Sequence, residues 1–280
     1  MSTIAESLEL AVRSLFRHSD SPRLDAELLL GKVLGLSRSA LIARGALPVG
    51  PDSEQRYARL IEERRGGSPV AYLTGTREFW SLPLSVTPAV LVPRPETEVL
   101  VELALDLLPA DVPWSILDLG TGSGAIALAI TSERPRWRVT GVDVSADALA
   151  VAMQNSRALD LSRVEWLLGS WFDAVPGRRF DMIVANPPYV AAGDPALERL
   201  SAEPAIALCA GPTGLEAPTA IVANARLHLS DRGWLVMEHG REQAAQIAAL
   251  LERHGFKHIR SAADFSGNPR VTLGTVHTQH

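Results

Sequence analysis

The stretch that decides the fold is residues 115–125, which read SILDLGTGSGA. It predicts a short apolar strand, a glycine-rich turn and the start of a helix. Beyond it, apolar strands expected near 138–144, 163–169, 180–185 and 233–239 alternate with stretches of helical spacing. Strands that alternate with helices are typical of an α/β fold, in which helices cover both faces of a parallel, doubly wound sheet.

The last two expected strands, 256–260 and 270–276, break this alternation. The segment between them, SAADFSGNP at 261–269, has no helical pattern. A hairpin joins such neighbours most simply, and it reverses the direction of the chain. We therefore expect an antiparallel strand at the end of the sequence in an otherwise parallel sheet.

Residues 1–75 read as a small helical domain with nearly balanced charge, which favours docking to a partner, or a lid, over an electrostatic clamp. We expect a helix that starts at Ser21 and Pro22. Its buried face is predicted to contain three apolar residues, Leu24, Leu28 and Leu29. Asp52 and Ser53 are candidate caps of the next helix.

Residues 76–93 change character and are expected to form a β-hairpin linker. Leu82 and Leu84 alternate with smaller or polar residues, as in a half-buried strand. Residues 94–280 then form the second domain, which contains the expected sheet.

Composition excludes several classes of function. The 280 residues carry a net charge of −5, which argues against a protein that mainly binds nucleic-acid phosphates. The one cysteine, Cys209, excludes an internal disulfide, and the seven histidines show no metal-ligand spacing. The N-terminus lacks a signal-peptide pattern and no apolar run reaches about 18 residues, so a cytoplasmic protein without a membrane span is expected.

The turn after the first strand is a candidate cofactor site, formed by Gly120, Thr121, Gly122, Ser123 and Gly124. Glycines let the backbone approach a ligand closely, and the helix N-terminus that follows attracts anionic groups. Asp143 ends the next strand, where a carboxylate can bind both hydroxyls of a ribose. The pattern fits a nicotinamide or flavin dinucleotide as well as S-adenosylmethionine. Asp118, just ahead of the glycines, is an acid of the kind that methyltransferase loops carry.

Asn186, Pro187, Pro188 and Tyr189 follow the expected strand FDMIVA and form a second candidate site. The Asn186 side-chain oxygen and the Pro187 carbonyl can both accept hydrogen bonds from one planar NH2 group. Tyr189 can stack against the flat system that bears it. Such a nitrogen is a poor nucleophile, so its orientation toward an activated methyl group would matter most. The pattern therefore predicts an acceptor site for methyl transfer.

Three further features are less specific. Trp171 is expected either to stack on adenine or to lie in the core. The segment PRPETE at 93–98 either lines the pocket mouth or caps the following helix through Thr97. His239 ends an expected strand without a visible partner.

At this point the sequence resembles the release-factor glutamine methyltransferases of the HemK/PrmC type. The resemblance covers nearly the whole chain. It rests on PVAYLTGTREFWSLPLSV, LVPRPETE, ILDLGTGSGAIALAI, GVDVS, the tryptophan of GSWF, NPPYV, MEHG and NPRVTLG.

The resemblance implies a helical N-terminal domain, a β-hairpin connection and a Rossmann-like methyltransferase domain. It implies methylation, from S-adenosylmethionine, of the glutamine amide in the Gly-Gly-Gln motif of peptide chain release factors. The implied cofactor residues are Gly120 to Gly124, Asp143, Trp171 and Asn186. The implied glutamine site is Asn186 to Tyr189, with Asn186, Pro187 and Tyr189 as its catalytic residues. The segment 191–203 departs from the family pattern.

Other functions remain open on the residues alone. An adenine also presents a planar NH2, so a DNA or RNA methyltransferase could use the same geometry, although the net charge weighs against it. A ribosomal-protein glutamine is another possible target. A dinucleotide-dependent oxidoreductase, or a binding module without activity, would leave Asn186 to Tyr189 unexplained.

Overall fold

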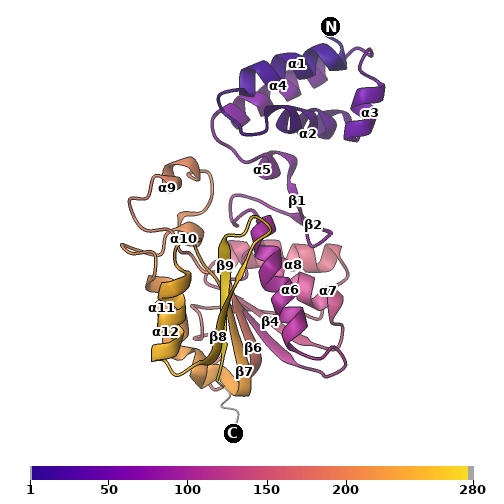
Figure 1. Cartoon of the computed structure of the whole chain (residues 1–280). Helices are drawn as coiled ribbons and strands as arrows, with labels where there is room; N and C mark the ends of the chain where they lie inside the picture. The colour runs from indigo at the N-terminus through magenta and orange to yellow at the C-terminus, as the bar shows by residue number, and fades with distance from the viewer. Residues whose placement is uncertain (1, 277–280) are drawn as a thin grey trace. The chain divides into compact units, whose positions relative to one another are not determined.

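The strand expected at the opening motif is β3 (Ser115–Leu119), an interior strand of a seven-stranded sheet. The computed structural model describes residues 2–276 (Figure 1). Its contacts divide the chain into two units. The first contains Met1–Thr76 with Arg199–Ala202, and the second contains Arg77–Glu198 with Glu203–His280.

The first unit is helical, as predicted. Its helices are α1 (Ile4–Leu15), α2 (Pro22–Leu34), α3 (Arg38–Ala43), α4 (Pro51–Arg65) and α5 (Val70–Thr74). Thr3 and Glu6 cap the start of α1 reciprocally, because each side chain accepts a hydrogen bond from the other residue's backbone N–H. The helices enclose an apolar core that contains Leu8, Leu15, Leu29, Leu30 and Leu41.

Two local predictions in this unit need correction. Leu29 of α2 is buried as predicted, but Leu24 and Leu28 are each 38% exposed, and Leu30 is buried beside Leu29. The small residue Ala26 completes that face, so the buried stripe is rotated relative to the one we expected. Helix α4 is capped by Gly50 rather than by Asp52 or Ser53, because Pro51 occupies the first helical position.

The sheet of the second unit confirms the predicted fold class. Its strand order is β5-β4-β3-β6-β7-β9-β8. The strands besides β3 are β4 (Arg138–Asp143), β5 (Glu165–Leu168), β6 (Phe180–Ala185), β7 (Leu229–Glu238), β8 (Lys257–Ala263) and β9 (Pro269–Thr275). The first five in this order are parallel, whereas β9 pairs antiparallel with both β7 and β8. The terminal hairpin therefore forms as expected.

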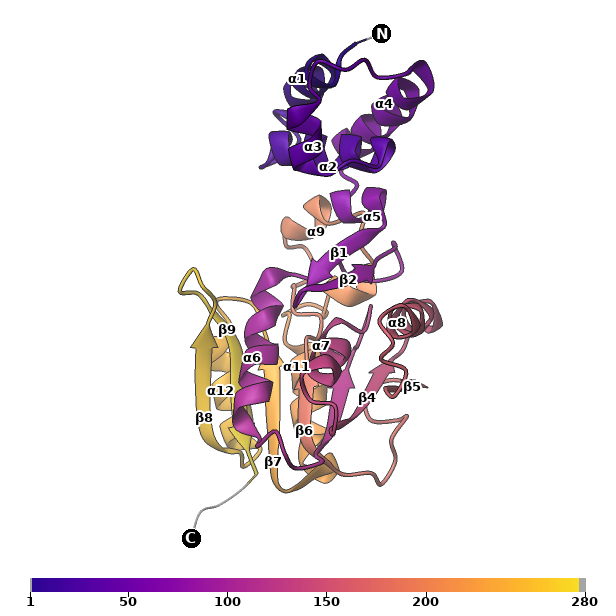
Figure 2. The ribbon, with the colours of Figure 1, turned by 90° about the vertical axis from the view of Figure 1, so that its right-hand side faces the viewer.

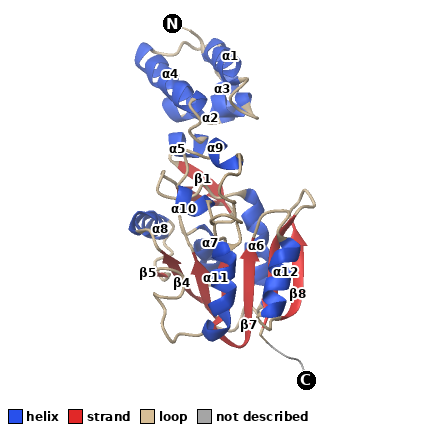
Figure 3. Cartoon of the chain, turned by 90° about the vertical axis from the view of Figure 1, so that its left-hand side faces the viewer, coloured by secondary structure: helices blue, strands red, loops and turns tan. Residues whose placement is uncertain are grey.

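Helices cover both faces of this sheet. One face carries α6 (Glu98–Leu107), α7 (Ala125–Glu133) and α8 (Ala146–Ala158) (Figure 2). The other carries α11 (Glu216–Ala225) and α12 (Ala244–Arg253) (Figure 3). The remaining helices are short: η1 (Pro95–Thr97), α9 (Ala196–Arg199), α10 (Ala205–Leu208) and η2 (Arg226–His228). Among the described residues, no helix combines the length and apolar character needed to cross a membrane.

The predicted hairpin consists of β1 (Thr76–Phe79) and β2 (Leu82–Ser85). Its two turn residues, Trp80 and Ser81, both have positive φ, as tight hairpin turns require. The amide of Asn155 on α8 holds β2 by donating to the Ser85 carbonyl and accepting from the Ser85 N–H, at 3.0 and 2.7 Å. From Arg77 onward the hairpin clusters with the second unit.

Candidate active site

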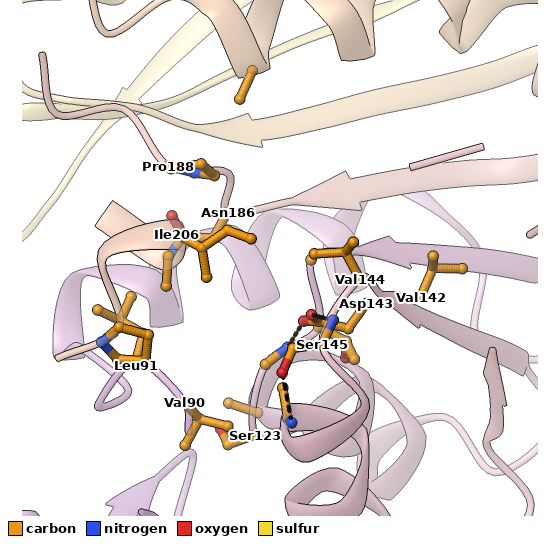
Figure 4. Close-up of a pocket in the computed structure, with 18 of the residues that line it drawn as sticks. Val90, Leu91, Ser123, Val142, Asp143, Val144, Ser145, Asn186, Pro188 and Ile206 are labelled. Atoms are coloured by element: carbon orange, nitrogen blue, oxygen red, sulfur yellow. Dashed lines mark hydrogen bonds between the residues drawn. The ribbon is translucent and has the colours of Figure 1, made fainter. Parts of the chain in front are cut away.

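A cavity of about 380 Å³ lies at the carboxyl ends of β3, β4 and β6. Eight of the predicted site residues line it: Gly120, Thr121, Gly122, Ser123, Asp143, Trp171, Asn186 and Pro188. Figure 4 shows Asp143 and Ser145 on one side of the cavity and Asn186, Pro188 and Ile206 on another. The volume lies within the usual range for a small-molecule site.

Asp143 is held in a fixed orientation at the end of β4. One carboxylate oxygen accepts a hydrogen bond from the Gly122 N–H at 2.8 Å, and the other accepts from the Ser145 N–H at 2.9 Å. Gly120 and Gly122 both adopt positive φ, which keeps the turn close to the strand. Each carboxylate oxygen keeps a lone pair free for a ligand hydroxyl.

Gly124 does not line the cavity but lies behind its wall. It caps α7 with φ +81°, and a Cβ there would lie 2.9 Å from the Trp166 ring and 3.2 Å from Ala152. Gly124 therefore lets α7 begin directly against α8 and Trp166.

Trp171 forms part of the cavity wall next to the glycine turn. Its backbone has φ +46°, unusual for an aromatic residue. Its ring would be 3.5 Å from a Cβ placed on Gly120, so the indole and the turn are in close contact. Trp171 packs against the core and also faces the cavity, so a place in the core does not remove it from the candidate site.

Asp118 is completely buried beneath the glycine turn. Its Oδ2 accepts a hydrogen bond from the Thr121 hydroxyl at 2.6 Å, while Oδ1 has no partner among the described residues. Burial raises the pKa of Asp118 to about 7, while the Thr121 hydroxyl and the backbone near Ala127 partly oppose the rise and the charge of Asp143 adds to it. A cationic ligand in the cavity would favour the ionised form of this carboxyl group.

Asn186 follows β6 and reaches the cavity through its side chain. Its Nδ2 donates to the Thr97 hydroxyl at 3.3 Å. No described residue donates a hydrogen bond to Asn186 Oδ1 or to the Pro187 carbonyl. Neither oxygen therefore has a donor in the part of the chain that the structure describes.

Pro187 and Tyr189 lie outside the cavity wall. Pro187 is buried, and the Tyr189 carbonyl accepts a hydrogen bond from Gln243 Nε2 at 3.1 Å. Burial raises the pKa of Tyr189 to about 12, so its phenol is neutral at physiological pH. The next residue, Val190, forms a β-bridge with Cys209, which anchors the segment beside α10.

Sequence reasoning missed Glu203, which is buried and pairs with Arg94 on the cavity wall. Glu203 Oε2 also accepts a hydrogen bond from the Val92 N–H at 3.0 Å. Glu203 ends the segment 191–203, and no local pattern marks it as the partner of Arg94, which is 109 positions away.

The structure gives hydrogen-bond partners to Thr97 and His239. Thr97 precedes α6 but makes no capping hydrogen bond, which excludes the capping role considered above. His239 is buried, with Nδ1 against the Gly240 carbonyl and Nε2 against the Thr272 hydroxyl, at 2.8 Å each. Burial lowers the pKa of His239, which favours its neutral form. No group of possible metal ligands gathers within the part of the chain that the structure describes.

Comparison with known proteins gives two family matches and close relatives. Residues 6–75 match the PrmC N-terminal domain, and residues 97–211 match the methyltransferase small domain. The chain is 48% identical to the release factor glutamine methyltransferase of Salmonella typhimurium, over 95% of this chain and 96% of the relative. It is 49% identical to that of Pseudomonas aeruginosa, over 91% and 93%.

Solved structures share the fold of the second unit. A 16S rRNA methyltransferase of T. thermophilus, solved with AdoMet and guanosine, superimposes with a TM-score of 0.54 at 20% identity. The match covers 71% of this chain and 49% of that one. At this identity the likeness shows a shared fold and nothing about the substrate.

Proposed function

The chain belongs to the release factor glutamine methyltransferases, and we propose that its Asn186 and Pro187 oxygens bind the glutamine amide that receives the methyl group. It is a protein-(glutamine-N5) methyltransferase that acts on peptide chain release factors. Within those factors we assign the glutamine of the Gly-Gly-Gln motif as the target.

The cavity fits a nucleoside methyl donor of the S-adenosylmethionine type, as expected of a methyltransferase domain. The turn at 120–124 would approach it through the backbone, Asp143 would bind its ribose and Trp171 its adenine. The partnerless oxygen of buried Asp118 supports a cationic ligand nearby. When bound, S-adenosylmethionine supplies an electrophilic methyl group, and the residues of this chain provide orientation.

The two free oxygens carry the proposal for the acceptor side. Asn186 Oδ1 and the Pro187 carbonyl accept no hydrogen bond from the described residues, so a planar NH2 group can donate one N–H to each. With both N–H bonds directed at the protein, the nitrogen can be held in line with the methyl group. Neither acceptor titrates near neutral pH, so orientation is what this pair contributes.

We assign the helical residues 1–75 to docking of the release factor, with 76–93 as the connecting hairpin and 94–280 as the catalytic domain. The match to the PrmC N-terminal domain and the helical fold of the first unit support this assignment. A cytoplasmic location follows from a substrate that works in translation. The net charge of −5 weighs against a nucleic acid as direct partner.

Transfer of a labelled methyl group to purified release factor tests the proposed target. We expect label on the intact factor and none on a factor whose Gly-Gly-Gln glutamine is changed to alanine. Label that persists on the altered factor would move the target elsewhere, and label on a ribosomal protein alone would favour the alternative substrate. Calorimetry should show binding of S-adenosylmethionine, whereas binding of NAD(H) alone would overturn the cofactor assignment.

A further inference from the structure

Three distant segments meet behind Asn186: the PRPETE segment through Thr97, the end of β6 through Asn186, and the end of β7 through Glu238. Thr97 is 3% and Glu238 is 2% exposed. Asn186 Nδ2 lies 3.3 Å from the Thr97 hydroxyl oxygen. Thr97 and Asn186 both face the Glu238 carboxyl group, and both side chains favour its ionised form. The proposed function uses only Asn186 of these three.

A hydroxyl group has one hydrogen to donate, whereas a carboxyl group only accepts once it is ionised, as Glu238 is above its pKa of about 7. If the Thr97 hydrogen points to Glu238, the Thr97 oxygen can only accept from its other neighbour. That neighbour is the amide of Asn186, which must then turn its NH2 toward Thr97. Its oxygen is left to face the cavity.

We propose that Glu238 and Thr97 are positioning residues that fix the Asn186 amide with its oxygen toward the substrate. The inference rests on the proposed function, because the orientation matters only if the substrate offers N–H groups. A flipped Asn186 would present its own NH2 to the glutamine NH2, and two donors cannot bond. Glu238 thus determines the orientation of the Asn186 amide without itself contacting the substrate.

The surroundings of Glu238 make its carboxyl group costly to bury. Burial raises its pKa to about 7, whereas the Thr97 and Asn186 side chains and the charge of Arg270 oppose the rise, and Glu96 adds to it. Tyr189 also faces the group, and its electrostatic partners include Glu238, Arg270, Arg94 and Glu96. Glu238 Oε2 has no hydrogen-bond partner among the described residues. An apolar side chain would avoid this desolvation, so the carboxyl group calls for another explanation.

Removal of the Thr97 hydroxyl is the first test. Thr97→Val should lower kcat for release factor on the order of tenfold with little change in S-adenosylmethionine affinity, because one orienting hydrogen bond is lost. Thr97→Ser, which restores the hydroxyl, should recover most of that loss. Thr131→Val is the matched control, since Thr131 is also buried but donates to the Ala127 carbonyl of its own helix at 2.7 Å.

Glu238→Gln is the second test, because its expected effect on kcat differs between the otherwise unchanged enzyme and an Asn186→Asp variant. In the otherwise unchanged enzyme, the new NH2 group can donate to the Thr97 oxygen, and the Thr97 hydrogen can then point to Asn186. The Asn186 amide would turn its oxygen toward Thr97 and its NH2 toward the cavity, so kcat should fall. In an Asn186→Asp background, a carboxylate presents an oxygen to the substrate in either orientation, and Glu238→Gln also removes a like charge. There the same change should leave kcat unaltered or raise it.

The outcomes separate this inference from the proposed function. Equal losses from Glu238→Gln in both backgrounds, or an unchanged kcat for Thr97→Val, would overturn the positioning roles alone. If the unsubstituted enzyme fails to methylate release factor, the proposed function fails and the inference fails with it. Thermal unfolding of each variant should show a folded protein, so that a loss of kcat reports orientation rather than unfolding.

Discussion

Arg94 and Glu203, which are 109 positions apart in the sequence, form an ion pair on the wall of the cavity. Glu203 is buried, while the Arg94 side chain is 34% exposed. The pair joins the PRPETE segment to the residues that precede α10, and the Val92 N–H adds a second contact to Glu203. Together these contacts hold residue 203 at the cavity wall.

Glu203→Ala should therefore weaken both the fold and the cavity. The change leaves the Val92 N–H and Arg94 without their buried acceptor, and we expect a loss of about 2 kcal/mol in the free energy of unfolding. Urea denaturation measures it, and cofactor affinity should fall in parallel. Glu62→Ala, which removes an exposed ion pair with Arg65, is the control and should change stability little. Equal effects of the two substitutions would contradict the role of Glu203.

Two glycines of one turn should behave differently. Gly124→Ala places a Cβ 2.9 Å from Trp166 at φ +81°, so we expect a loss of stability of about 2 kcal/mol. At Gly122, which lines the cavity, a Cβ would meet nothing within 4 Å. The φ of +57° at Gly122 still costs an alanine about 1 kcal/mol, so Gly122→Ala should lose less stability than Gly124→Ala and mainly reduce cofactor affinity. Thermal unfolding and calorimetry on both variants check this division, and a reversed pattern would contradict it.

The affinity for S-adenosylmethionine should depend on pH through Asp118. Its pKa of about 7 in the ligand-free protein means that the carboxyl group is neutral below and ionised above that pH. A cationic ligand favours the ionised form, so affinity should increase as pH rises from 6 to 8. S-adenosylhomocysteine, which lacks the sulfonium charge, should show a smaller increase. Calorimetry across this range measures both, and Asp118→Asn should flatten the dependence.

Glu238 should make stability depend on pH in a defined direction. Its folded pKa of about 7 lies above the unfolded value of 4.5, so the folded state holds more protons between these values. The free energy of unfolding should therefore fall as pH rises from 4.5 to 7 and then level off. Glu238→Gln should remove a decline of roughly 3 kcal/mol at most. Urea titrations at pH 5 and pH 8 measure the decline in each protein. If Glu238→Gln lost more stability between pH 5 and pH 8 than the unsubstituted protein does, the predicted sign would be contradicted.

The sequence was informative wherever function depends on the ends of strands. Local patterns predict the sheet and its antiparallel terminal strand. They also predict that Asp143 and Asn186 line one cavity, because the carboxyl ends of parallel strands share one edge. The Arg94–Glu203 pair and the Asn186–Thr97 hydrogen bond were not predictable, since each joins segments about a hundred residues apart through tertiary packing. Gly124 shows a third case, in which a motif glycine serves helix packing rather than the cavity.

The central claim is that the Asn186 and Pro187 oxygens orient the glutamine amide. The most direct measurement is single-turnover transfer of a labelled methyl group to release factor by the unsubstituted enzyme and by Asn186→Ala. With S-adenosylmethionine bound to saturation in both, we expect Asn186→Ala to slow transfer on the order of a hundredfold, because orientation is lost. Transfer at an unchanged rate by Asn186→Ala would contradict the account.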